Sequence, residues 1–217
     1  MREFLPYRKA RDYKILSELI VDDAIVKPST GDHGKKQVIL TETDDKNSYS
    51  VKIHSIPDTV SVFVVKSDIF PPPKAIFKNN KNECKRADYI LLVEQEEGKY
   101  QGKYVIFLEL KSGKDSNSDI IAQLKCSLGL FKYCRTIGKI FWEEEDFLKD
   151  YKFCFVTIKN IPAHRQRLNK KPTRIDKESL LKSESIESSL SWIPRKLIIF
   201  CYQNEFYFNQ FFHGILT

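Results

Sequence analysis

Two carboxylates and a lysine interrupt a stretch of the sequence that otherwise predicts two buried β-strands. The stretch covers residues 84–114 and has the sequence CKRADYILLVEQEEGKYQGKYVIFLELKSGK. Asp88 stands at the start of the first apolar run, and Glu109 and Lys111 stand at the end of the second. Because side chains alternate between the two faces of a strand, Glu109 and Lys111 project from the same face. An isolated charge on a buried strand is costly unless it is paired or bound to a metal, so this pattern requires a partner.

The two apolar runs are separated by the polar turn EQEEGKYQGK, which favours a β-hairpin. Asp88 precedes Glu109 by 21 residues, so pairing of the two strands would bring both carboxylates to one edge of the sheet. Two carboxylates held close together repel each other unless a divalent cation lies between them, and oxygen ligands suit Mg²⁺ or Mn²⁺. The alternative is that the strand end emerges into solvent and leaves an ordinary Glu–Lys surface pair, worth at most about 1 kcal/mol.

The spacing of apolar residues predicts the elements that must position these side chains. A helix is expected over residues 6–26 and a second over 119–134, with Ser118 as its N-cap and Gly138 just past its end. Further strands are expected in QVILTETDDKNSYSVKIHSI, which holds two strands and a turn, and in TVSVFVVKSDIF, YKFCFVTI and RKLIIFCY, with EFYFNQFF as a candidate for a last strand. A chain of 217 residues, 41% of them hydrophobic, can bury one core. We therefore expect a single α/β (α+β) domain.

This arrangement resembles the signature of the PD-(D/E)xK nuclease superfamily, which has an Asp on one strand and Glu/Asp-x-Lys on the next, flanked by core helices. The matching residues are Ala87-Asp88 in KRADYILLV and Glu109-Leu110-Lys111 in VIFLELKSG, with alanine where the signature has proline. The resemblance covers residues 84–134, and the strand at 152–159 is the next expected core element. It implies a restriction-endonuclease-like core, a mixed central β-sheet flanked by helices, with an N-terminal β-hairpin insertion. The single nuclease-like domain, 1–217, would then comprise a core motif at 84–160, extra strands at 37–66 and a basic, serine-rich loop at 161–192.

The resemblance implies a metal-dependent endonuclease that hydrolyses phosphodiester bonds. Asp88 and Glu109, with the backbone carbonyl of Leu110, would hold one or two Mg²⁺ or Mn²⁺ ions, which activate water and neutralise charge on the phosphate. Lys111 would orient that water and stabilise developing negative charge. Gln123, in the following helix, would hold the water or contact a phosphate; the alternative is a polar side chain on a half-exposed helix face.

Further residues are expected to bind metal or nucleic acid near Asp88, Glu109 and Lys111. Many members of the superfamily add an acid from the first core helix, for which Glu18 is our candidate, although Glu3 and other acids compete. Ser112 and Lys114 follow the Glu109 strand and would lie near a bound phosphate. The basic run between residues 165 and 177 is the best candidate for contacting the phosphates of a nucleic acid, with a solvated loop as the alternative. The basic residues that we assign to this role are Arg165, Arg167, Lys170, Lys171 and Arg174.

The charge balance agrees with an anionic partner. The chain has 36 Lys and Arg against 29 Asp and Glu, a formal net charge of +7. The resemblance implies DNA as the substrate, with RNA not excluded, and a role as the effector of a restriction or antiphage defence system, which compact members often have. No sequence-reading domain is evident, so a partner protein or a homo-oligomer would supply specificity or activation. The alternative is a catalytically inactive module of the same fold that binds nucleic acid or a partner protein, although carboxylates beside a phosphate would repel it.

Other classes of function find no support in the sequence. The segment TGDHGKK does not fit the phosphate-loop pattern, the four histidines form no HExxH motif, and GxSxG does not occur. The N-terminal residues lack the apolar region of a signal peptide, and no run of about 18 apolar residues could span a bilayer. Five cysteines without a CxxC pair favour free thiols in a reducing compartment. We expect a cytoplasmic protein without membrane contact.

Overall fold

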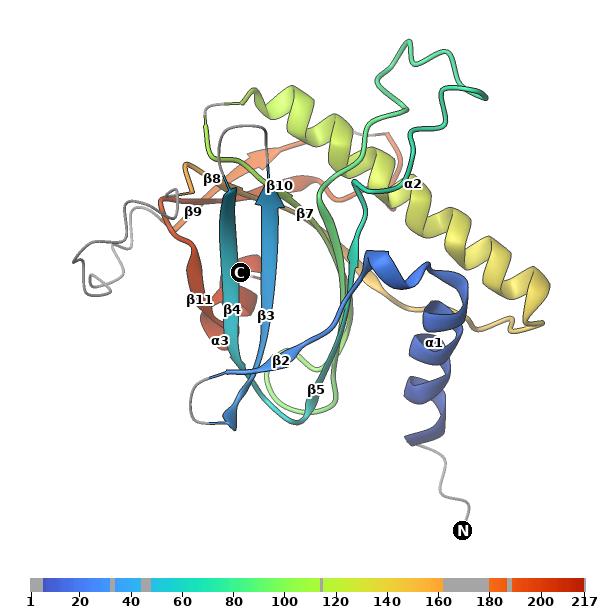
Figure 1. Ribbon diagram of the computed structural model, residues 1–217, viewed down its shortest axis with the longest axis vertical. Coiled ribbons are helices and arrows are strands. Elements are labelled where there is room, and N and C mark those ends of the chain that lie inside the picture. Colours follow the sequence, from blue (N-terminus) through green and yellow to red (C-terminus); the bar gives the residue numbers. More distant parts are fainter. Residues whose placement is uncertain are drawn as a thin grey trace.

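The computed structural model describes residues 6–31, 34–43, 48–113, 115–161, 180–186 and 189–216. Two β-sheets and the helices form three layers: two helices cover one face of the larger sheet, and the smaller sheet with the last helix covers the other (Figure 1). Both sheets contain parallel and antiparallel pairs, so the chain is an α+β protein. Among the described residues no helix is both long and apolar enough to cross a membrane. The five cysteines are free.

The larger sheet contains the predicted hairpin at its centre. Its strand order is β1-β5-β6-β7-β8-β10-β9. The strands β5, β6 and β7 pair antiparallel, with Tyr89 opposite Leu108 and Gln95 opposite Gly102, whereas β8 and β10 continue the sheet in parallel. The hairpin prediction is therefore confirmed. The bounds are β1 Ile25–Val26, β5 Val60–Lys66, β6 Tyr89–Gln95, β7 Gly102–Leu110, β8 Lys152–Lys159, β9 Leu180–Ser185 and β10 Lys196–Cys201.

The smaller sheet packs over one face of the larger sheet. Its order is β11-β4-β3-β2, with bounds β2 Ser29–Thr30, β3 Lys36–Thr43, β4 Ser48–Ile56 and β11 Glu205–Tyr207. Of the extra strands expected at 37–66, β3 and β4 form this sheet, while β5 joins the larger one beside β6. Apolar side chains from both sheets share one core, among them Val38, Leu40, Val51, Ile53, Leu91, Val93, Ile106, Leu108 and Phe206.

The expected last strand, EFYFNQFF, is a strand only over its first three residues. From Phe208 the chain forms the helix α3, Phe208–Leu216. The reason is the spacing of Phe208, Phe211, Phe212 and Ile215, which places four apolar side chains on one helical face, and that face is buried in the core between the sheets. The helical period was not recognised in the sequence because aromatic residues also occur in the strand before these four positions.

The helices α1, Pro6–Leu19, and α2, Asn117–Phe141, cover the opposite face of the larger sheet. A short 3-10 helix, Asp22–Ala24, follows α1, so the first helix ends earlier than predicted. Alternate residues of β6 and β7 point into this second core, where they meet the buried stripe of α2. The side chains concerned are Ile90, Leu92, Val105 and Phe107 from the strands and Ile120, Leu124, Leu128 and Phe131 from α2.

The helix α2 is longer at both ends than predicted. Its N-cap is Ser116 rather than Ser118, because the Ser116 hydroxyl accepts a hydrogen bond of 3.2 Å from the backbone N–H of Asp119. Gly138 lies inside the helix instead of past its end. A Cβ atom at position 138 would overlap the ring of Phe147, so the glycine here provides space for packing rather than a helix stop.

Candidate metal centre

Four carboxylates lie at one end of the larger sheet, and we refer to Glu42, Asp68, Asp88 and Glu109 as the four-acid cluster. Glu42 is the penultimate residue of β3, Asp68 follows the end of β5, Asp88 precedes the first residue of β6, and Glu109 is the penultimate residue of β7. These ends are adjacent because β5, β6 and β7 are consecutive neighbours in the sheet, with the Ser67 N–H donating to the Asp88 carbonyl at 2.8 Å. The strand pairing therefore fixes three of the four acids.

Asp88, Glu109 and Lys111, the three residues predicted to form the site, are in contact. The Asp88 N–H donates to Glu109 Oε2 at 3.1 Å, and the Leu110 N–H donates to Asp88 Oδ2 at 2.7 Å. Lys111 Nζ lies 2.6 Å from Glu109 Oε1. Glu109 is fully buried and Asp88 is 9% exposed, so the surface-pair interpretation of the motif does not describe this geometry.

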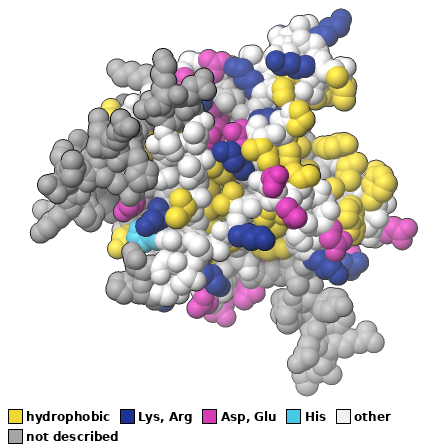
Figure 2. All heavy atoms as spheres, viewed as in Figure 1, with side chains coloured by type: hydrophobic (Ala, Val, Ile, Leu, Met, Phe, Trp, Pro, Cys, Tyr) yellow, Lys and Arg dark blue, Asp and Glu magenta, His cyan; other side chains and the backbone are white. Residues whose placement is uncertain are grey.

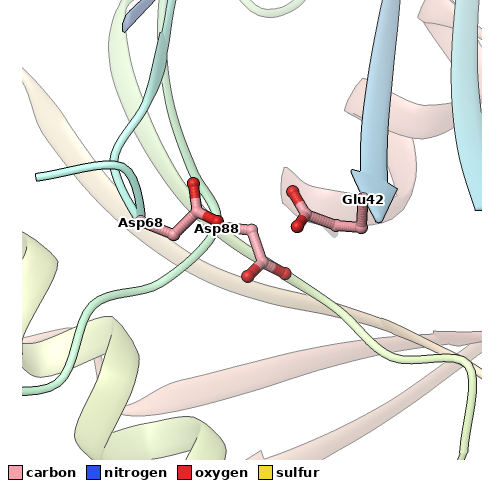
Figure 3. Close-up of side chains that lie close together, drawn as sticks. All are labelled: Glu42, Asp68 and Asp88. Atoms are coloured by element: carbon pink, nitrogen blue, oxygen red, sulfur yellow. The ribbon is translucent and has the colours of Figure 1, made fainter. Parts of the chain in front are cut away.

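Glu42 and Asp68 were missed in the sequence analysis. Oxygen atoms of Glu42, Asp68 and Asp88 all lie within 4.8 Å of one another. Figure 3 shows Glu42 reaching from β3 toward Asp68 and Asp88, which lie on neighbouring segments. Asp68 lies two residues after the end of an apolar strand, and this position could have identified it, since Asp88 was selected for its place at the start of another. No comparable signal marks Glu42, because its place depends on how the two sheets pack.

Side chains of the larger sheet hold the end of β3 in place. The Tyr89 hydroxyl donates to the Thr41 carbonyl at 2.7 Å and accepts from the Thr41 N–H at 2.8 Å. Lys66 Nζ donates to the same carbonyl at 3.0 Å and lies 3.3 Å from Glu42 Oε1. These contacts bring the Glu42 carboxylate over the end of the larger sheet.

The Leu110 carbonyl, predicted to be a metal ligand, accepts a hydrogen bond of 3.2 Å from the buried hydroxyl of Tyr49. Tyr49 lies in β4, so this bond also joins the two sheets. The Leu110 carbonyl thus has a structural partner on one of its two lone pairs, and its role as a metal ligand stays a prediction.

The electrostatics of the cluster disfavour four negative charges. Burial raises the pKa of Glu109 to about 7, against the opposing effect of Lys111. Burial, followed by the charges of Glu109 and Glu42, raises the pKa of Asp88 well above its usual range. The pKa values of Glu42 and Asp68 are also raised, in both cases mainly because the carboxyl group is partly shielded from solvent. Each of these shifts means that the ionised form is destabilised here, and a bound cation would reverse that effect.

Two lysines of the described segments contact the cluster, and they leave part of its charge unpaired. Lys66 lies beside Glu42, and Lys111 lies beside Glu109. Within the described part of the chain, Asp68 and Asp88 have no ion-pair partner. Asp68 is exposed, so the cluster is open to solvent on that side.

Gln123 also belongs to this region. Its Nε2 donates to the Arg86 carbonyl at 3.2 Å, and its side chain lowers the pKa of Glu109 through a hydrogen bond. On the neighbouring strand β8, Thr157 is opposite Glu109 and fully buried, and its hydroxyl has no hydrogen-bond partner among the described residues. Both side chains lie on the α2 side of the sheet end, where Glu109 points.

Glu18 does not join the cluster. Its carboxylate accepts a hydrogen bond of 2.8 Å from Trp142 Nε1, at the C-terminal end of α2. Trp142 is 19 residues beyond Gln123, about 28 Å along the axis of a helix. Glu18 therefore lies near the C-terminal end of α2, whereas the cluster lies near its N-terminal end. The additional carboxylates of the cluster are those of Glu42 and Asp68.

The residues expected to contact nucleic acid are only partly described. Ser112 is exposed just after β7, close to Lys111. The others lie outside the described residues, namely Lys114, Arg165, Arg167, Lys170, Lys171 and Arg174.

No protein-family model, no curated protein and no solved structure matches this chain. Its function must therefore be inferred from the geometry of the four-acid cluster. Carboxylate oxygens are the ligands that Mg²⁺ and Mn²⁺ prefer, so the donor set fits a hard divalent cation. A protonated lysine beside such a site is suited to stabilising negative charge on a substrate oxygen.

Proposed function

We propose that this protein is a Mg²⁺- or Mn²⁺-dependent nuclease that hydrolyses phosphodiester bonds of DNA at the four-acid cluster. The observation that carries the proposal is the convergence of four carboxylates and Lys111 at one end of the larger sheet. The order β6, β7, α2, β8, with β8 parallel to β7, supports a restriction-endonuclease-like core. A role as the effector of a restriction or antiphage system, with a partner or second copy supplying specificity, belongs to the same proposal.

Glu42, Asp68 and Asp88 would hold the cation, and Glu109, hydrogen-bonded to the Asp88 backbone, is the nearest further ligand. A divalent cation bound there supplies Lewis-acid charge that activates water and neutralises the phosphate. The exposed side chain of Asp68 provides the route from solvent.

Lys111 would act as a cation toward the substrate. Burial acts to lower its pKa, but the charges of Glu109 and Asp88 outweigh that effect and raise it, so the side chain stays protonated at neutral pH. Its side chain is 22% exposed and can reach an incoming phosphate while Nζ remains beside Glu109. A protonated amine at this position favours the transition state, in which negative charge on the phosphate grows.

The alternative is a catalytically inactive module of this fold that binds nucleic acid or a partner protein. The full burial of Glu109 and its contact with Lys111 favour this alternative, because a buried ion pair can be purely structural. The absence of a cation partner for Asp68 and Asp88 in the described residues favours the enzyme, since a structural site gains nothing from unpaired carboxylates.

The test is a cleavage assay on supercoiled plasmid, linear duplex, single-stranded DNA and RNA in Mg²⁺, Mn²⁺ or EDTA. Lys111→Ala should lower cleavage by roughly 100-fold or more, and Asp68→Asn, which removes a ligand of the cation, should raise the metal concentration needed for half-maximal cleavage. The matched control is Lys139→Ala, which removes a lysine 2.7 Å from Glu145 at the far end of α2 and should leave cleavage unchanged. A folded wild type that binds these nucleic acids and cuts none of them would refute a nuclease that is active on its own and would favour the inactive module.

A further inference from the structure

The segment between β5 and β6, residues 67–88, is a long loop whose two ends meet at the four-acid cluster. The Ser67 N–H donates to the Asp88 carbonyl at 2.8 Å, and the Ser67 hydroxyl donates to the Ala87 carbonyl at 2.5 Å. The loop therefore leaves the sheet at Asp68 and returns to it at Asp88. In Figure 1 it stands out from the body of the molecule beyond α2, at the upper right.

The 67–88 loop is held in shape by its own hydrogen bonds. The Glu83 carboxylate accepts from the N–H groups of Asn80 and Lys81 at 3.1 and 2.7 Å, and the Cys84 N–H donates to Asn79 Oδ1 at 3.0 Å. Asn79 and Asn82 adopt positive φ angles of 64° and 60°, a conformation that asparagine tolerates better than most residues.

Two contacts tie the loop to the first half of α2. Lys85 Nζ lies 2.7 Å from Asp119 Oδ1, and the Cys126 thiol donates to the Asn82 carbonyl at 3.1 Å. These anchors restrain the returning part of the loop, and such restraint reduces the entropy that a ligand must offset on binding.

The tip of this ordered loop exposes apolar and basic side chains and no acids. Ile76 is 77% exposed and Phe77 is 50% exposed. Lys74, Lys78 and Lys81 are exposed around them, and no Asp or Glu occurs between Asp68 and Glu83. Figure 2 shows basic and hydrophobic side chains together on this projection. A fixed loop that keeps large apolar side chains in water marks a binding surface.

We propose that the 67–88 loop holds the nucleic-acid strand at the four-acid cluster, with its lysines on backbone phosphates and Phe77 stacked on a base. The inference rests on the proposed function and adds the element that binds the substrate. The carboxylates of the cluster repel a phosphate, and the three exposed lysines of the loop offset that repulsion, because the loop starts and ends at two of those carboxylates. An aromatic ring stacks on any base, so the contact is independent of sequence.

The shape of the loop argues against a lipid surface as the occupant. A membrane offers a wide and flat contact, whereas the loop projects from the body of the molecule (Figure 1). A single strand or a locally opened duplex can follow the projection from its tip to the cluster.

Binding is measured by the anisotropy of labelled single-stranded and duplex oligonucleotides, in Mg²⁺, with Lys111→Ala as the background in which cleavage is slow. The measured quantity is the slope of log K against the logarithm of the salt concentration. Replacing Lys74, Lys78 and Lys81 together by Gln should make this slope less steep by roughly 2 to 3, because each phosphate contact contributes about 0.7 to 0.9 to it. The control replaces three exposed lysines elsewhere by Gln and should retain the wild-type salt dependence; these are Lys27, Lys35 and Lys149.

Phe77 is tested by three substitutions on the same background. Phe77→Ala should weaken binding about 5- to 150-fold, the range of one lost base–aromatic stack. Phe77→Tyr should restore it because the ring is kept, and Phe77→Leu should not. Val21→Ala, at an apolar side chain that is 60% exposed elsewhere on the surface, should bind as the background does.

The outcomes separate this inference from the proposed function. If the wild type cuts no substrate but the loop variants still weaken binding, the nuclease proposal fails and the strand contact stands. If the wild type cuts DNA and the loop variants bind as tightly as the background, the loop inference is overturned and the nuclease stands. Variants that release the protein from phosphatidylserine vesicles without changing oligonucleotide binding would also overturn it, in favour of a lipid surface.

Discussion

Glu109→Gln should remove a pH-dependent loss of stability from the metal-free protein. Burial raises the pKa of Glu109 from its ordinary 4.5 to about 7, although Lys111 acts in the opposite direction. Between these two pH values the unfolded chain has released this proton and the folded chain still holds it. The unfolded state therefore binds fewer protons, so the free energy of unfolding falls as the pH rises from 4.5 through 7. Glutamine keeps the shape of the side chain and has no proton to release.

The size of this effect follows from the difference between the two pKa values. They differ by roughly 2.5, and one pKa unit corresponds to about 1.4 kcal/mol. Ionisation of Glu109 should therefore lower the free energy of unfolding by about 3 kcal/mol between pH 4.5 and pH 8. Because Glu109 is fully buried, solvent does not screen this term. Over the same pH range, the free energy of unfolding of Glu109→Gln should fall by at least that amount less than the free energy of unfolding of the wild type. The variant also removes the charge of Glu109 that raises the pKa of Asp88.

The assay is urea unfolding in EDTA from pH 4.5 to 8, followed by the fluorescence of Trp142 and Trp192. Glu145→Gln is the control, because Glu145 is an exposed carboxylate paired with Lys139 and should leave the wild-type pH dependence unchanged. Mg²⁺ added at pH 8 should restore stability to the wild type, because a cation that binds only the folded state stabilises it. A wild type whose stability is constant or rises over this range, or a Glu109→Gln variant that follows the wild-type curve, would refute the reasoning.

Two further predictions concern packing within the fold. Gly138→Ala should lower the free energy of unfolding by about 1 to 3 kcal/mol, because its Cβ overlaps the ring of Phe147; Gly129→Ala, in the same helix with open space around it, should raise it by roughly 0.5 to 1 kcal/mol. Equal effects in urea unfolding would contradict the packing described here. Tyr49→Phe removes the hydroxyl that bonds a β7 carbonyl and should cost about 1 kcal/mol. The exposed Tyr202→Phe is its control, and equal stability of the two variants would exclude a role for that bond.

The contact between Asp88 and Glu109 could be predicted because it depends on local features. Two apolar runs joined by a short polar turn pair as a hairpin, and the register of that hairpin places the start of one strand beside the end of the other. Lys111 follows from the same register, since it is two residues beyond Glu109. The features that predict this part of the site all lie within residues 84–114.

The remaining acids depend on packing between elements that are distant in sequence. The period of an amphipathic helix indicates which face of α1 is buried, but not the position along α2 at which that face rests, so Glu18 could not be placed. Glu42 belongs to a sheet whose position over β6 is fixed by the bonds of Tyr89 and Lys66 to Thr41. No periodicity in the sequence reports such contacts.

The smaller sheet is therefore part of the site and not only an addition to the fold. Its strand β3 carries Glu42 to Asp68 and Asp88, and its strand β4 supplies the Tyr49 hydroxyl that engages the backbone between Glu109 and Lys111. Assembly of the four-acid cluster thus requires the two sheets to dock, and docking brings together carboxylates that repel one another. The apolar core between the sheets must offset that repulsion in the metal-free protein, whereas a bound cation would turn the same contact into a stabilising one. Metal binding and the docking of the smaller sheet should consequently be coupled, each strengthening the other.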